Sequence, residues 1–161
     1  MPEHLAHSLE QTVDREAVQL RAITERDAGL KPSPDAWSRK EELGHLIDSA
    51  TNNHVRFVRA SLEPEFRGPG YQQNGWVSLH GYHEMPWADL MDFWKRYNTF
   101  LAGVVRRIPE ELLERKCVVG ESQPVTLQFL IEDYILHMQH HLDHILKREK
   151  MTQYPGAALG V

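Results

Sequence analysis

Four segments of the chain repeat apolar residues at intervals of three and four, and no other sequence feature constrains the fold as strongly. Such intervals place the apolar side chains on one face of a helix, so each segment is expected to form an amphipathic helix. Between them, no stretch alternates apolar and polar residues for long enough to predict a sheet. The fold class is therefore expected to be all-α, a four-helix bundle. The predicted helices cover about residues 2–26, 39–60, 86–108 and 126–150.

The predicted helices carry local end signals. Ser38 lies three residues before Glu41, which is the spacing of a reciprocal capping box. Thr126 can cap the last helix, whereas Gly29 and Pro109 are expected to end the first and the third. The helix ends are thus predicted independently of the apolar periodicity.

Residues 61–83 separate the second predicted helix from the third and show neither period. The segment is rich in glycine, proline and aromatic residues, so it is expected to be a long aromatic loop. Loops of this length tend to be functional or disordered. We expect this one to pack over the bundle as a lid, with Trp76 and Tyr82 shaping a pocket.

The length of 161 residues suits one domain, which we expect to span residues 1–151 and to be followed by a C-terminal tail at 152–161. The net charge of −5 supplies no positive field for nucleic acid or a membrane surface, so neither is an expected partner. No apolar run approaches the roughly 20 residues of a bilayer span. Because a single cysteine, Cys117, rules out an internal disulfide and no secretory signal is visible, we expect a cytoplasmic protein.

Histidine is the unusual component, with ten in the chain and four close together in the last predicted helix. Residues four apart lie on one helix face, and two pairs have this spacing, His137 with His141 and His140 with His144. Either pair could bind a metal at about 2.0–2.1 Å, and the spacing leaves the choice open. One helix cannot surround an ion. His45, in the middle of the second helix, is the leading candidate for a third ligand.

Three neutral imidazoles leave a divalent ion its full charge and an open coordination position, which is typical of a catalytic site. A water or thiol bound there would lose its proton near neutral pH. Two carboxylates are candidate catalytic residues that orient a ligand or relay protons: Asp48, one turn after His45, and Asp133, four residues before His137. The plainer alternatives are a solvated row of histidines on the last helix and a hydrogen-bonded core histidine at position 45.

Two stretches, Trp37–Ser49 and His140–Ile145, resemble the DinB-like superfamily of four-helix metalloproteins, including its branch of metal-dependent hydrolases and bacillithiol transferases. The resemblance covers nearly the whole chain, and it implies that His45, His140 and His144 hold a divalent metal. It also implies zinc or nickel as the ion and a homodimer as the assembly. Histidine ligands are compatible with iron as well.

The expected function is that of a metal-dependent hydrolase or thiol S-transferase, in which the metal activates water or a low-molecular-weight thiol for attack on a small-molecule substrate. The family often has Glu after the first histidine of the late pair, whereas here His141 follows, which resembles the transferase-like branch. The same residue excludes a zincin, which needs Glu at that position as its general base. The alternatives are a non-catalytic metal-binding or stress-related bundle and a metal-free interaction protein.

Overall fold

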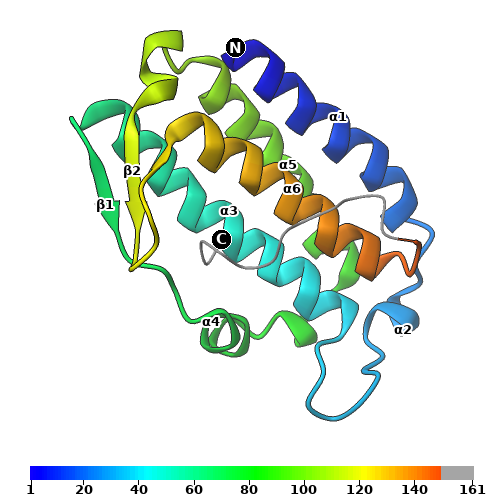
Figure 1. The fold of residues 1–161 in the computed structure, drawn as a ribbon. Helices are drawn as coiled ribbons and strands as arrows, with labels where there is room; N and C mark the ends of the chain where they lie inside the picture. Colours follow the sequence, from blue (N-terminus) through cyan, green and yellow to red (C-terminus); the bar gives the residue numbers. More distant parts are fainter. Residues whose placement is uncertain (150–161) are drawn as a thin grey trace.

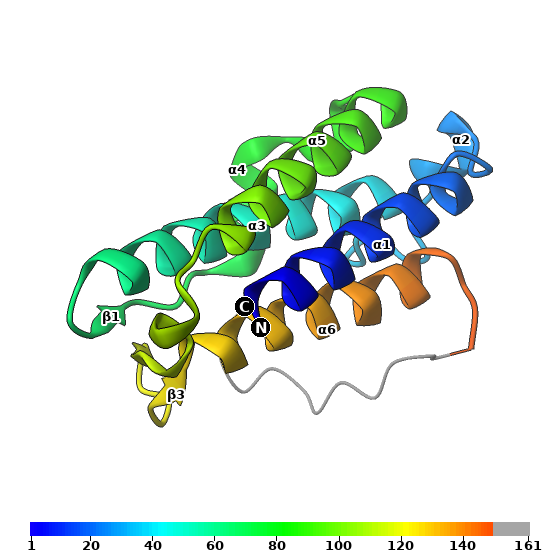
Figure 2. The ribbon, with the colours of Figure 1, turned by 90° about the horizontal axis from the view of Figure 1, so that it is seen from above.

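Four long helices run side by side in residues 1–149, the part of the chain that the structure, a computed structural model, describes (Figures 1 and 2). These helices are α1 (Pro2–Leu20), α3 (Arg39–Leu62), α5 (Trp87–Arg106) and α6 (Leu127–Ile145). α1 packs mainly against α5, and α3 packs against both α5 and α6. The all-α four-helix bundle predicted from the periodicity is confirmed. The predicted domain limit at residue 151 and the tail at 152–161 lie outside the described residues.

Short elements fill the connections between the long helices. β1 pairs in parallel with β2, and β2 pairs antiparallel with β3, which forms a small sheet at one end of the bundle (Figure 1). In this sheet Phe66 lies opposite Cys117, and Lys116 lies opposite Thr126. The short elements are α2 (Glu25–Ala28), β1 (Phe66–Gly68), α4 (Gln73–His80), 3₁₀ helices at Tyr82–Glu84 and Glu110–Glu114, β2 (Lys116–Val119) and β3 (Val125–Thr126).

The segment predicted as a long aromatic loop is more regular than expected, because β1, α4 and a 3₁₀ helix occupy most of it. Each of these elements is too short to show a period, and β1 obtains its hydrogen bonds from β2, which is distant in the sequence. The segment does fold back onto α3, where the buried ring of Tyr82 packs directly on Gly44. A Cβ atom at position 44 would lie 2.1 Å from Cδ2 of Tyr82, so only glycine permits this close approach.

The apolar stripe predicted on the last helix is entirely buried and joins side chains of α1, α3 and α5 in one core cluster. Burying such a stripe removes its apolar surface from water and holds the four helices together. Within the described residues, every helix is too short or too polar to span a lipid bilayer. The stripe of α6 consists of Leu127, Leu130, Ile131, Tyr134, Met138, Leu142 and Ile145.

The predicted helix starts are confirmed. Oγ of Ser38 accepts a hydrogen bond from the backbone N–H of Glu41, and the Glu41 carboxylate accepts one from the backbone N–H of Ser38, which completes the capping box. The Thr126 side chain accepts from the N–H of Phe129 and caps α6. α1 ends earlier than predicted, at Leu20, and α2 forms separately after a short turn.

α6 ends at Ile145 rather than at the predicted residue 150. Lys147 adopts a left-handed backbone conformation with φ of 50°. Its N–H donates to the carbonyl of His144 at 3.1 Å, and the N–H of Arg148 donates to the carbonyl of Asp143 at 3.2 Å. These two bonds form a Schellman motif, which usually has glycine at the left-handed position. The sequence has lysine there, so the usual signal for this helix end is missing.

Candidate metal centre

Three imidazole rings meet between α3 and α6. His45 comes from α3, whereas His137 and His141 are one turn apart on α6, and one ligand atom from each of the three lies within 4.8 Å of the other two. Nε2 of His45 and Nε2 of His137 are 3.3 Å apart. The ring of His141 lies 4.7 Å from that of His45 and 4.6 Å from that of His137, between ring centroids. The bundle thus gathers three nitrogen ligands from two distant stretches of chain.

Burial keeps two of these rings neutral. His45 is fully buried and His137 is 4% exposed. Burial, with a smaller contribution from the neighbouring His141, lowers the pKa of His45 to about 3. Burial, with smaller contributions from His141, His45 and His140, holds the pKa of His137 well below its usual range. At neutral pH both rings therefore carry a nitrogen lone pair, which is the form that binds a metal.

The residues present fit a divalent metal. Two nitrogens bonded to one ion at 2.0–2.1 Å and at a tetrahedral angle lie about 3.3–3.4 Å apart, which matches the separation of the two Nε2 atoms of His45 and His137. Imidazole is a common ligand of zinc, nickel and iron. His45 is held against the ring of Trp37, with centroids 5.1 Å apart.

Glu42 is a candidate site residue that the sequence did not indicate. Its buried carboxylate accepts a hydrogen bond from Nδ1 of His141 at 2.9 Å and another from Nδ1 of His144 at 2.6 Å. Because Nδ1 of His141 is bonded to this carboxylate, Nε2 is the ring nitrogen left to face a metal. Carboxylates commonly fix the ring of a metal-binding histidine in this way. Glu42 lies one turn before His45 on the same helix, and this spacing is the signal that could have identified it.

Of the three ligands that the family resemblance implies, the structure places His45 in the cluster. The side chain of His144 is 75% exposed and bonds to Glu42. His140 is partly exposed, and its ring centroid lies 5.5 Å from that of His141. The nitrogen group around His45 is completed by His137 and His141, the other pair with a spacing of four. The direction in which this part of α6 faces α3 determines which pair lies beside His45, and the spacing alone does not contain that information.

The two predicted catalytic carboxylates are both buried, and their recorded partners lie outside the three-histidine group. Oδ1 of Asp48 accepts a hydrogen bond from the Tyr82 hydroxyl at 2.7 Å and from Nδ1 of His80 at 2.8 Å. Burial raises the pKa of Asp48, and these two donors offset part of that effect. Asp48 therefore ties the end of α4 and the 3₁₀ helix after it to α3. Asp133 interacts electrostatically with the buried guanidinium of Arg56.

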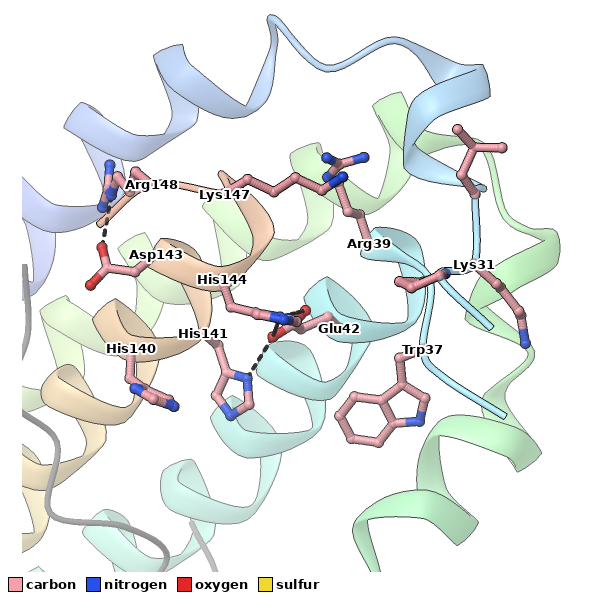
Figure 3. Close-up of a pocket in the computed structure, with 12 residues that line it drawn as sticks. Lys31, Trp37, Arg39, Glu42, His140, His141, Asp143, His144, Lys147 and Arg148 are labelled. Carbon is pink, nitrogen blue, oxygen red and sulfur yellow. Dashed lines mark hydrogen bonds and ion pairs between the residues drawn. The ribbon is translucent and has the colours of Figure 1, made fainter. Parts of the chain in front are cut away.

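A cavity of about 710 Å³ lies against the cluster, between the connector that precedes α3 and the C-terminal half of α6 (Figure 3). Glu42, His141 and His144 form part of its wall, and His141 is 20% exposed. This volume is within the range of pockets that hold small-molecule ligands. The exposed edge of His141 therefore connects the buried nitrogen group with a cavity large enough for a small molecule.

Residues 8–145, most of the chain, match the DinB superfamily. The chain belongs to this superfamily. A DinB-type bundle was the expectation from the two sequence stretches around the histidines, and the match confirms it.

Individual proteins are also similar to this chain. The chain is 25% identical over 109 residues to a protein of Oceanobacillus iheyensis named "Putative metal-dependent hydrolase OB0782", and the alignment covers 68% of this chain and 63% of that protein. The chain thus spans less than two thirds of that relative. YfiT from Bacillus subtilis, described as a probable metal-dependent hydrolase with an unusual four-helix bundle topology, matches with a TM-score of 0.77 and 18% identity over 91% of this chain and 84% of YfiT.

A mutant of the mycothiol-dependent maleylpyruvate isomerase is also similar in structure, with a TM-score of 0.73 and 11% identity. The match covers 95% of this chain and 62% of the isomerase chain. At such identities YfiT and the isomerase establish the DinB bundle as the fold of this chain and leave its activity to be argued from the site.

Proposed function

We propose that this DinB-superfamily protein is a metal-dependent enzyme whose divalent ion is held by His45, His137 and His141. The observation that carries the proposal is the convergence of three imidazole nitrogens within 4.8 Å, two of them on buried neutral rings. The competing prediction is His45 with His140 and His144, which would replace His137 and His141. Zinc or nickel is proposed as the ion, and iron is chemically compatible. We also propose that the protein forms a homodimer and is located in the cytoplasm.

A divalent ion held by His45, His137 and His141 would supply a Lewis acid that lowers the pKa of a water or thiol. The chain itself fixes the ligands. Glu42 holds the proton on Nδ1 of His141 and so keeps Nε2 of that ring as the lone-pair atom. His144 bonds to the same carboxylate and is exposed to the cavity, so its ring can exchange a proton with a molecule bound there.

The two predicted carboxylates have supporting roles in this proposal. Asp48 positions His80 and Tyr82 against α3, close in sequence to the ligand His45. Asp133 lies one turn before His137 on α6 and provides negative charge on that side of the bundle. Both act on the site through other residues rather than as ligands.

The proposed reaction is hydrolysis of a small molecule by metal-activated water, as the names of the relative from Oceanobacillus iheyensis and of YfiT suggest. Transfer of a low-molecular-weight thiol is the second candidate. It is favoured by the structural similarity to a mycothiol-dependent isomerase. A divalent ion held by the three histidines would supply the positive charge that stabilises a thiolate. A parallel screen of ester hydrolysis and of thiol conjugation to an electrophilic arene, on protein loaded with each metal, separates the two reactions.

Elemental analysis of untagged protein tests the metal itself. We expect a stoichiometric divalent ion, a lower melting temperature after treatment with a chelator, and recovery when the metal is restored, because ligand binding to the folded state stabilises it. Addition of azide to cobalt-loaded protein should change the visible absorption, since azide enters an open coordination position. A protein without metal and with an unchanged melting temperature contradicts the proposal. Bound metal that ignores azide favours the non-catalytic alternative.

Replacing Glu42 with glutamine is expected to weaken metal binding. Glutamine keeps the size of the side chain but removes the charge that holds the Nδ1 protons of His141 and His144. Loss of such a partner typically lowers metal affinity roughly 10–100-fold. Competition with a chromophoric chelator measures the change. Glu132→Gln, an exposed substitution of the same kind on α6, is the matched control, and equal affinities of the two variants would remove Glu42 from the site.

A further inference from the structure

The cavity beside the metal centre is lined by more positive than negative side chains. Lys31, Arg39, Lys147 and Arg148 line it, against the carboxylates of Glu42 and Asp143 (Figure 3). The net charge of the whole chain is −5, so this concentration of positive charge is not a property of the surface in general. Which of these cations is already neutralised decides what the cavity can bind.

Two of the four cations are paired with carboxylates. Nζ of Lys31 lies 2.9 Å from Oε1 of Glu41. The guanidinium of Arg148 bonds to Asp143 at 2.7 Å and to the buried carboxylate of Glu16 at 2.8 Å. Charges compensated in this way attract a further anion only weakly.

Arg39 and Lys147 keep their charges uncompensated. The Arg39 guanidinium donates to the backbone carbonyls of Ile145 and Asp27, at 2.8 and 2.9 Å, and these acceptors are neutral. Lys147 makes no ion pair and no side-chain hydrogen bond within residues 1–149. Figure 3 shows both side chains along the same edge of the cavity, above Glu42 and His144. An anionic group placed there would meet two cations that have no carboxylate partner.

The rest of the cavity wall offers apolar contact. The indole of Trp37, which also packs against His45, lines it together with Leu30 and Pro32. A molecule bound in the cavity can therefore place a flat apolar body against Trp37 and a negative group near Arg39 and Lys147. The exposed edge of His141 lies in the same wall, so such a molecule is also adjacent to the metal centre.

We propose that the substrate of this site is an anion with an apolar or aromatic body, such as a carboxylate, whose charge is bound by Arg39 and Lys147. This inference rests on the proposed function for the reaction. Anion binding itself requires only the cavity, so it can be measured with and without metal.

A matched pair of probes tests the inference: 2-naphthoate and its neutral counterpart 2-naphthamide, titrated into the full chain. The indole N–H resonance of Trp37, assigned with Trp37→Phe, reports binding in the cavity. We expect naphthoate to bind about fivefold or more tightly than the amide, in metal-loaded and in chelator-treated protein alike. In cobalt-loaded protein naphthoate should also alter the visible absorption, because it binds next to the ion.

Variants of the two cations supply the decisive comparison. The preference should fall to within about twofold in the double variant Arg39→Met, Lys147→Met, and persist in Lys95→Met, which removes one positive charge elsewhere. Arg39 also bonds to the carbonyl of Ile145 at the end of α6, so its replacement could disturb the fold as well as remove a charge. Two variants control for this: Lys147→Met alone, and Arg39→Lys, which keeps the charge.

Equal binding of the two probes by the unaltered protein overturns the inference, as does a preference that survives the double variant. An unchanged cobalt spectrum on naphthoate binding would place the anion away from the metal and overturn its assignment as substrate. A protein that carries no metal but still prefers naphthoate would instead contradict the proposed function alone.

Discussion

Replacing His137 with alanine is expected to remove the bound metal, whereas replacing His140 with alanine is expected to leave it in place. His137 contributes a nitrogen 3.3 Å from that of His45, and its loss leaves two ligands. We therefore expect a larger loss of affinity than the roughly 10–100-fold caused by removing an outer hydrogen-bond partner. Elemental analysis of untagged variants after dialysis measures the effect.

The variants form a matched set, because His137 with His141 and His140 with His144 have the same spacing on the same helix. Alanine at 137 or 141 should abolish stoichiometric metal, and alanine at 140 or 144 should not. His137→Leu keeps the volume of the buried side chain and guards against a simple failure to fold, which circular dichroism monitors. The reverse outcome, with metal lost only from the variants at 140 and 144, would establish the set that the family resemblance implies.

Gly44→Ala is expected to destabilise the protein by about 2 kcal/mol, although alanine is the better helix former by up to about 1 kcal/mol. The added Cβ would lie 2.1 Å from Cδ2 and 2.2 Å from Cγ of Tyr82, far inside contact distance. Relieving this overlap moves the ring away and strains its hydrogen bond to Asp48. Overpacking of this kind costs about 1–3 kcal/mol, and a lost bond to a carboxylate adds to it. The melting temperature should fall by about 4–8 °C.

Two comparisons isolate the contact between Gly44 and Tyr82. Gly75→Ala places a Cβ no closer than 3.6 Å to any neighbour in α4, so it should be neutral or slightly stabilising. In the Tyr82→Ala variant the ring is absent, so Gly44→Ala should no longer lower the free energy of unfolding by much. A double-mutant cycle, with each free energy of unfolding taken from urea denaturation, measures this difference. A melting temperature equal to that of the unaltered chain would show that the ring does not lie against α3.

The parts of the fold that were predictable from the sequence are those set by local rules. The long helices follow from an apolar period that burial enforces, and the capping box at Ser38 depends only on a side chain three residues away. The segment after α3 was not predictable in this way, because β1 exists only by pairing with β2. The end of α6 was missed for a different reason: Lys147 takes a conformation that usually requires glycine.

The candidate site was predictable only where it depends on local spacing along a helix. The spacing of four on α6 and the position of His45 predicted that the two helices meet at histidines. The choice between the two α6 pairs depends on the rotation of α6 relative to α3, a tertiary quantity that no spacing contains. Glu42 escaped notice because a glutamate in the first turn of a helix is common for electrostatic reasons alone. Its proposed role depends on hydrogen bonds from His141 and His144, which lie on another helix, α6.

The hydrogen bond from Arg39 to the carbonyl of Ile145 joins the first residue of α3 to the last residue of α6, and these are the two helices that supply the imidazoles. This hydrogen bond opposes a shift of α3 along α6. Under the proposed function, this bond helps to keep the helices that carry the three nitrogens in register, so less conformational entropy is lost on metal binding. Uptake should then proceed on a folded scaffold, unlike that of small zinc modules that are unstructured without their ion.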